Sequence, residues 1–159
     1  MSPLTFALTQ LMSDWVSGQL DNLVSFRKGK KVETSPFLLA GFKRYLGAGA
    51  LVGKHDGYAS TYSSVLATET DVLMLWDGER SGLVGHNLNG VVSSTVSKLS
   101  PNGQVSTDYL YYYLLNNFDW IQNRRTGTGV PHVPKDLGRI LLIKYPIDSA
   151  YQKKISSVL

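Results

Sequence analysis

The middle of the chain consists of short apolar runs separated by residues that favour turns. Gly, Ser, Asn or Asp bound the runs at 36–40, 65–67, 72–76 and 90–99. Short apolar runs between turn signals are typical of strands. The segment 72–76 is apolar at every position, which predicts a strand buried on both faces. The spacing of these runs therefore predicts a β-rich core.

The N-terminal third begins with a helix signal. Ser2 can cap a helix that has Pro3 at its first position. Apolar residues then recur at helical spacing, which predicts a helix over 3–15. We expect a short helical turn over 20–24, followed by a strand over 25–31 that enters a basic loop.

Helical patterns return in the C-terminal third. Ser106 or Thr107 can cap a helix whose apolar stripe extends to Ile121. A strand is expected over 139–145, ended by the following proline. A last helix is expected to begin around Asp148 or Ser149. The whole pattern predicts a mixed α/β (α+β) fold, in which a single globular domain has a β-rich core and flanking helices.

Length and composition restrict the class of protein. At 159 residues the chain is long enough for one domain with a real core. It has no cysteine, so disulfides and thiolate metal sites are excluded. The first basic residue is Arg27, too late for a signal peptide, and no apolar run approaches the roughly 20 residues needed to cross a bilayer. We expect a soluble, cytoplasmic protein with no membrane contact.

The basic residues are grouped, although the formal net charge is only +4. Folding could bring separate groups onto one basic face, as a polyphosphate partner requires. The alternative is a solvated surface with no partner. The groups are Arg27, Lys28, Lys30 and Lys31; Lys43 and Arg44; Arg124 and Arg125; and Lys153 and Lys154.

Two stretches resemble a known family. They are Val72–Leu99, VLMLWDGERSGLVGHNLNGVVSSTVSKL, and Gly127–Lys135, GTGVPHVPK. Both resemble the target-recognition domain of the specificity subunits of type I restriction-modification enzymes (HsdS-like). In that domain a strand ends in a WDG-like turn, a Gly-rich loop and a GVVSST-like strand follow, and a G(T/S)G-(I/V)PHV loop comes later. Leu20–Lys31, Tyr109–Asn117 and Tyr145–Leu159 continue the resemblance in the same order.

The resemblance implies that residues 1–147 form a DNA target-recognition domain and that 148–159 begin a spacer or dimerisation helix. The chain would then be a specificity subunit, or half of one, that reads one part of a split target in double-stranded DNA. Methylation (M) subunits would supply the adenine chemistry, and a restriction (R) subunit would supply cleavage. The partner for the spacer helix would be a second recognition domain or a second copy of the chain. A chain that ends in mid-pattern is expected to be truncated or a half-sized subunit.

Catalytic motifs are missing from the sequence, so we expect no enzyme activity and no cofactor. There is no Pro-Pro-aromatic loop for amino-methylation and no GxSxG elbow. None of Glu33, Glu69 and Glu79 has lysine two positions later, as the common metal-dependent nucleases require. The three histidines have no metal-binding spacing.

The segment 47–56, GAGALVGKHD, has the Gly-Lys pair of a phosphate-binding loop. It departs from that motif at Ala48, where the first glycine is needed, and at His55, where the hydroxyl is needed. We interpret it as a flexible surface loop. A small enzyme that acts on phosphorylated ligands through this loop is one rival hypothesis.

The candidate DNA contacts are donor-bearing residues in loops, because such groups read phosphates and base edges. They are Lys28, Lys30, Lys31, Lys43, Arg44, Tyr62, Asn123, Arg124, Arg125 and His132. His132 has an alternative role, in which the imidazole fixes its own loop. The basic pair at 124–125 also has a local explanation at a helix C-terminus. The other rival hypothesis is a stand-alone DNA-binding or restriction-inhibitor protein with the same fold.

Overall fold

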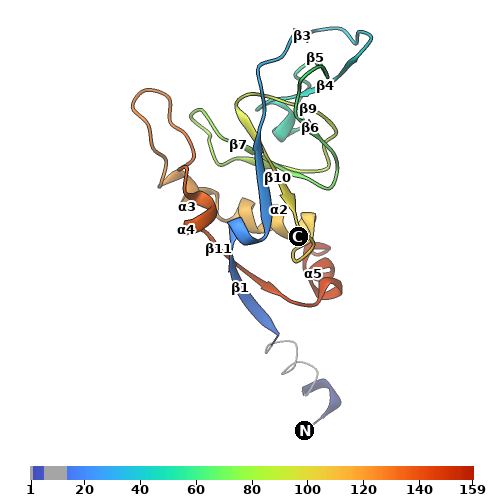
Figure 1. Ribbon diagram of the computed structural model, residues 1–159. Helices are drawn as coiled ribbons and strands as arrows, with labels where there is room; N and C mark the ends of the chain where they lie inside the picture. Colours follow the sequence, from blue (N-terminus) through green and yellow to red (C-terminus); the bar gives the residue numbers. More distant parts are fainter. Residues whose placement is uncertain (1, 6–13) are drawn as a thin grey trace.

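The protein is described by a computed structural model that covers residues 2–5 and 14–159 (Figure 1). Its strands are β1 (Trp15–Gln19), β2 (Val24–Lys28), β3 (Thr34–Ser35), β4 (Phe42–Leu46), β5 (Tyr58–Ser60), β6 (Leu66–Ala67), β7 (Val72–Leu75), β8 (Val84–Gly85), β9 (Gly90–Val92), β10 (Val96–Pro101) and β11 (Leu142–Pro146). Its α-helices are α2 (Thr107–Asn116), α3 (Phe118–Gln122), α4 (Leu137–Ile140) and α5 (Ser149–Ser156). Two short 3-10 helices are η1 (Leu20–Asn22) and η2 (Ala50–Val52).

The strands form three sheets. One has the order β2-β10-β7-β8 and is antiparallel throughout. A second has the order β3-β5-β4-β9-β6, in which β4 and β9 are parallel. The third pairs β1 with β11. Figure 1 shows β3, β4 and β5 at the top of the molecule, whereas β1 and α5 lie at the bottom. The mixed α+β fold expected from the sequence is confirmed.

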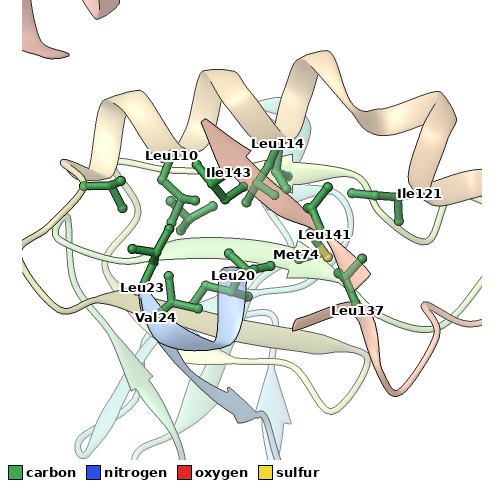
Figure 2. Close-up of a cluster of buried hydrophobic side chains, with 14 of the residues drawn as sticks. Leu20, Leu23, Val24, Met74, Leu110, Leu114, Ile121, Leu137, Leu141 and Ile143 are labelled. Carbon is green, nitrogen blue, oxygen red and sulfur yellow. The ribbon is translucent and has the colours of Figure 1, made fainter. Parts of the chain in front are cut away.

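Strand β7 lies between two hydrophobic cores. Val72 and Met74 belong to the larger core, and Leu73 and Leu75 belong to the smaller one. All four side chains are buried, which confirms the strand buried on both faces. Figure 2 shows the larger core, with labelled side chains from η1, β2, β7, α2, α3 and residues 137–143: Leu20, Leu23, Val24, Met74, Leu110, Leu114, Ile121, Leu137, Leu141 and Ile143.

Helix α2 begins as the sequence predicts. The Oγ of Ser106 accepts a hydrogen bond from the Tyr109 backbone N–H at 3.1 Å. The helix does not run on to Ile121, because Asn117 interrupts it and its Nδ2 donates to the Tyr113 carbonyl. Two helices, α2 and α3, therefore stand where one was expected.

The expected helix over 3–15 is wrong at its end. Residues 6–13 lie outside the described part of the chain, but Trp15 starts strand β1 and pairs with Pro146 of β11. The expected strand over 36–40 is also wrong. Those residues form a loop, which closes with a hydrogen bond from Phe42 N–H to the Leu39 carbonyl.

Two other segments, each predicted as a single strand, contain parts of two elements. The segment 90–99 holds β9 and β10, which belong to different sheets. A turn separates them, in which the Ser93 carbonyl accepts from Val96 N–H. The segment 139–145 ends α4 and begins β11, because the Asp136 carbonyl accepts from Arg139 N–H and Ile140 N–H in a short helix.

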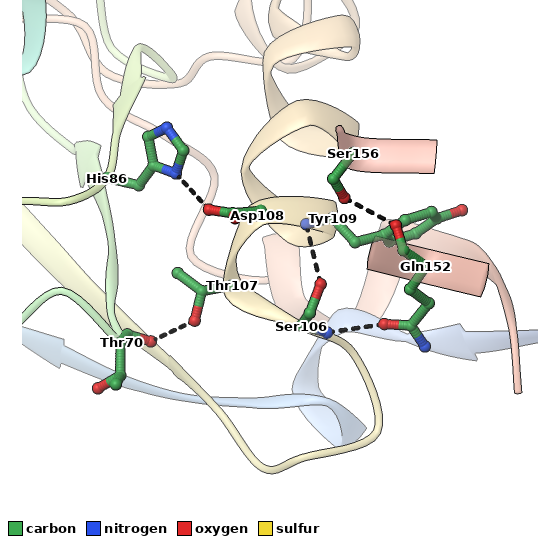
Figure 3. A network of polar contacts seen from close by, with 8 residues as sticks. All are labelled: Thr70, His86, Ser106, Thr107, Asp108, Tyr109, Gln152 and Ser156. Atoms are coloured by element: carbon green, nitrogen blue, oxygen red, sulfur yellow. Dashed lines mark hydrogen bonds and ion pairs between the residues drawn. The ribbon is translucent and has the colours of Figure 1, made fainter. Parts of the chain in front are cut away.

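Helix α5 begins where the sequence predicts. The carboxylate of Asp148 caps it by accepting from Ala150 N–H at 2.8 Å. Figure 3 shows how Gln152 of α5 lies against Ser106 at the start of α2. Helix α5 is therefore packed on the domain. Within the described residues, no helix has the length and apolar character to span a membrane.

Candidate nucleic-acid interface

The carboxyl ends of β2 and β7 lie at the same edge of their sheet, because both strands pair antiparallel with β10 between them. Lys28 is the last residue of β2, and its Nζ forms an ion pair with Asp77 Oδ2 at 2.5 Å. Asp77 follows β7 and also forms a backbone bridge with His132. Sheet topology therefore places Lys28 and His132 around the WDG turn.

Arg125 reaches the same turn from α3. Its Nη1 donates to the Glu79 carbonyl at 2.6 Å, and its Nε donates to the Gln122 carbonyl at 3.0 Å. Arg124 lies 3.7 Å above the Trp120 ring and donates to the Trp120 carbonyl. Both guanidinium groups thus hold carbonyls near the end of α3, as the local explanation of this basic pair requires. Asn123 is exposed at the C-cap of α3.

His132 is built into the Gly-rich loop. Its backbone exchanges two hydrogen bonds with Thr126, at 2.9 and 3.0 Å. A Cβ at Gly127 would lie 2.7 Å from the His132 ring, and Gly127 has φ +104°. Because the imidazole occupies the space that a side chain at 127 would need, the ring helps to set the shape of this loop.

Lys30 and Lys31 follow a tight crossing point between two sheets. Gly29 donates to the Val96 carbonyl, and a Cβ on Gly29 would lie 2.0 Å from the Ser93 carbonyl oxygen. Only glycine fits this approach. The chain then leaves the four-stranded sheet, exposes Lys30 and Lys31, and enters β3.

The remaining candidates lie on the five-stranded sheet. Lys43 is exposed on β4, and Tyr62, in the turn after β5, is 87% exposed. Arg44 is only half-buried, and its Nη2 donates to the Lys54 carbonyl at 3.0 Å. Among the described residues, Lys30, Lys31 and Lys43 have no hydrogen bond or ion pair from their side chains. Their ammonium groups are therefore available to a partner, whereas that of Lys28 is neutralised by Asp77.

Positive charge is concentrated in one part of the chain. Residues 27–67 carry seven basic and two acidic side chains, a net charge of +5. The rest of the chain carries nine basic and ten acidic side chains, a net charge of −1. Arg27 and Lys28 of this segment lie on β2 of the four-stranded sheet, whereas Lys43 and Arg44 lie on β4 of the five-stranded sheet. The basic residues thus run from the end of one sheet into the next.

The segment 47–56 is an ordered turn rather than the flexible surface loop that we expected. Ala50 and Leu51 of η2 are buried in the smaller core. The Asp56 carboxylate accepts from Ala50 N–H at 2.8 Å, and a Cβ on Gly49 would lie 2.2 Å from Asp56 Oδ1. A carboxylate thus already occupies the N–H group that a phosphate would need, which argues against the phosphate-loop hypothesis.

Sequence reasoning missed one feature of this region. Phe37, Leu38 and Leu39 are 72%, 65% and 47% exposed, next to the basic strands. The hydrophobic pattern of the sequence does not distinguish an exposed apolar run from a buried strand.

Within the described residues, no group of three or more His, Asp or Glu side chains could hold a metal ion.

The fold and the charge distribution define a class: a mixed α/β domain whose net positive charge lies in residues 27–67. A family model, "Type I restriction modification DNA specificity domain", matches residues 12–159. The chain belongs to this family. It is also 31% identical over 153 residues to the type I restriction enzyme MjaVIII specificity subunit of Methanocaldococcus jannaschii. That match covers 92% of this chain, which spans 35% of the relative's length.

Solved structures share the fold. The S subunit of a type I restriction-modification system from M. genitalium matches with a TM-score of 0.69 and 19% identity, over 91% of this chain and 37% of its own. The HsdS subunit from Thermoanaerobacter tengcongensis matches with a TM-score of 0.66 and 20% identity, over 91% of this chain and 36% of its own.

Proposed function

We propose that this chain is a DNA target-recognition domain that acts as a specificity subunit, or half of one, and reads one part of a split target. The observation that carries the proposal is the charge distribution, with a net +5 in residues 27–67 and −1 elsewhere. A duplex carries dense negative charge, so a protein that binds it needs unpaired cations on one face. Membership of the specificity-domain family supports DNA as the polyanion.

Lys30, Lys31 and Lys43 are the proposed phosphate contacts, because they are exposed and unpaired within the described chain. Lys28 contributes less while Asp77 holds its ammonium group. Tyr62 is exposed in the turn after β5, where its hydroxyl can donate to a phosphate or a base edge. Arg44 supports its own sheet through the Lys54 carbonyl and has less freedom to reach DNA.

The second group lies around the WDG turn, where the candidates are Asn123, Arg124, Arg125 and His132. Asn123 and Arg124 are the exposed members and are the proposed base contacts. Arginine matches the acceptor pair of guanine, and asparagine matches adenine. Arg125 and His132 hold the turn and the Gly-rich loop in place, so we assign them a positioning role.

The chain itself is proposed to be non-catalytic and to need no cofactor. Its partners would be double-stranded DNA, methylation subunits and a restriction subunit, and the site of action would be the cytoplasm. Residues 1–147 would be the recognition domain, and 148–159 would begin the spacer helix. Helix α5 would then be joined rigidly to the recognition domain, since Gln152 is fully buried against it. The spacer would meet a second recognition domain or a second copy.

The test is DNA binding as a function of salt. The parent chain is titrated with a pool of random-sequence duplexes at several salt concentrations. The double variant Lys30→Ala/Lys31→Ala should bind more weakly and lower the slope of log affinity against log salt by about 1 to 2. The matched control is Lys153→Ala/Lys154→Ala, which removes the same charge from α5 and should bind like the parent. Equal losses in both variants, or no salt-dependent binding by the parent, would contradict the proposal.

A further inference from the structure

The loop between β3 and β4 presents apolar side chains to solvent within the basic half of the molecule. Phe37 and Leu38 are 72% and 65% exposed, and Tyr62 in the adjacent turn is 87% exposed. Exposed apolar side chains that lie together and are rimmed by polar residues commonly mark an interaction site. Strands β3 and β4, which flank this loop, lie at the top of Figure 1, remote from β1 and α5.

Hydrogen bonds at both ends hold this loop in a fixed shape. The Oγ of Ser35 accepts from Phe37 N–H at 3.0 Å, and the Leu39 carbonyl accepts from Phe42 N–H. The Gly41 carbonyl accepts from both the N–H and the Oγ1 of Thr61. The loop is therefore tied to the turn that holds Tyr62. A loop held in this way keeps Phe37 and Leu38 outward instead of folding them onto the sheet.

The surroundings of the loop match a nucleic acid rather than an apolar protein surface. Lys30 and Lys31 precede β3, and Lys43 lies on β4, so unpaired cations occur before and after the loop along the chain. In the segment 29–67 the acidic residues are Glu33 and Asp56, and Asp56 is held by Ala50 N–H. An apolar tip between ammonium groups is complementary to a base step between phosphates.

We propose that Phe37 and Leu38 form a wedge that enters a base step of the bound duplex, while the flanking lysines hold the phosphates on either side. The proposal rests on the DNA-binding function proposed above. Apolar side chains such as Phe, Leu and Pro unstack a base step and kink the duplex when they insert from the minor groove. The chain would then choose its target partly by how easily a step opens, which favours flexible pyrimidine–purine steps.

The experiment uses a duplex enriched from a random pool by the parent chain. 2-Aminopurine, whose fluorescence rises when it is unstacked, replaces one base at a time. Saturating parent chain should raise the fluorescence at one or two adjacent positions. Phe37→Ala/Leu38→Ala should abolish the rise and weaken binding about tenfold, with the salt slope unchanged. Ile147→Ala is the control, because it truncates an equally exposed apolar residue outside the basic region.

The two proposals fail in different ways. Lys30→Ala/Lys31→Ala should lower affinity and the salt slope but keep the fluorescence rise at saturation. If the parent binds DNA without any rise, or if Phe37→Ala/Leu38→Ala keeps both the rise and the affinity, the wedge is refuted and the patch faces a protein instead. If the parent shows no salt-dependent binding to the random pool, the DNA-binding function itself fails.

Discussion

The side chain of Gln152 holds the backbone of Ser106 across the junction between α5 and α2. Its Oε1 accepts from Ser106 N–H at 2.8 Å, and its Nε2 donates to the carbonyls of Gln104 and Pro146, also at 2.8 Å. Figure 3 shows the amide reaching Ser106, whose own hydroxyl caps α2. One buried amide therefore satisfies three backbone groups from two segments, the connection before α2 and the end of β11.

Replacing Gln152 by alanine should lower the free energy of unfolding by about 3 kcal/mol, because it leaves these buried backbone groups without partners. Urea denaturation followed by circular dichroism measures the loss. Lys153→Ala, one residue further along the same helix and exposed, should stay within about 0.5 kcal/mol of the parent. Equal stability of the two variants would show that water replaces the amide.

Alkaline unfolding should depend on Tyr109. Burial raises the pKa of Tyr109 from 10.0 to about 12, and Tyr113 nearby acts in the same direction. The folded chain thus holds this proton more tightly than the unfolded chain does. The stabilisation is fully present below pH 10 and is lost as the pH rises towards 12.

Tyr109→Phe removes this titration together with the hydrogen bond to the Lys144 carbonyl. It should cost about 1 kcal/mol at neutral pH and then lose stability less steeply than the parent above pH 10. Tyr62→Phe, at an exposed position, should follow the parent. Denaturant titrations at a series of pH values give the free energy of unfolding of each protein as a function of pH. Parallel curves for the parent and Tyr109→Phe would refute the prediction.

Gly29→Ala should destabilise the chain by about 2 kcal/mol, since the added Cβ overlaps the carbonyl oxygens of Ser93 and Val92. These are backbone atoms of the last residue of β9 and of the turn that follows it, so no side chain can move aside. At Gly18 the nearest atom to an added Cβ is a Leu23 side-chain carbon at 3.6 Å. Gly18→Ala should therefore change the melting temperature little. A similar drop in melting temperature for Gly18→Ala and Gly29→Ala would count against the close approach of Gly29 to the Ser93 and Val92 carbonyls.

Substitutions of the two arginines after α3 should lower the free energy of unfolding by different amounts. Arg125→Ala loses hydrogen bonds to two carbonyls, including that of Glu79, and should cost about 1.5 kcal/mol. Arg124→Ala loses an exposed ring contact and one exposed hydrogen bond, both to Trp120 one turn earlier, and should cost about 0.5 kcal/mol. Urea midpoints of the two variants give the comparison. The reverse order would mean that the link to the WDG turn is weak.

Local signals predicted the elements that local interactions create. Ser106 and Asp148 cap their helices with their own side chains, so the capping residues were sufficient to locate both starts. The run 72–76 was predicted as a strand buried on both faces, and its first four residues form β7 with buried side chains, whereas Trp76 follows the strand and is half-buried. The signals for these features lie among neighbours in sequence.

The predictions from sequence were wrong where residues far apart in the chain determine the local structure. Trp15 has helical spacing with the residues before it, yet it pairs with Pro146 at the other end of the chain. The run 36–40 has the composition of a strand but lies outside both cores. For the same reason the neutralisation of Lys28 by Asp77 could not be predicted. The candidate lysines were identified by type, but their freedom from partners is a property of the fold.

The position of β7 between the two cores has a consequence for how the molecule comes apart. Its alternate side chains, such as Met74 and Leu73, are fully buried on opposite faces. Neither core can unfold without exposing one face of β7. The five-stranded sheet and the helices should therefore unfold together, in a single calorimetric peak. Surface loops on such a frame can change in sequence and length while the transition stays cooperative.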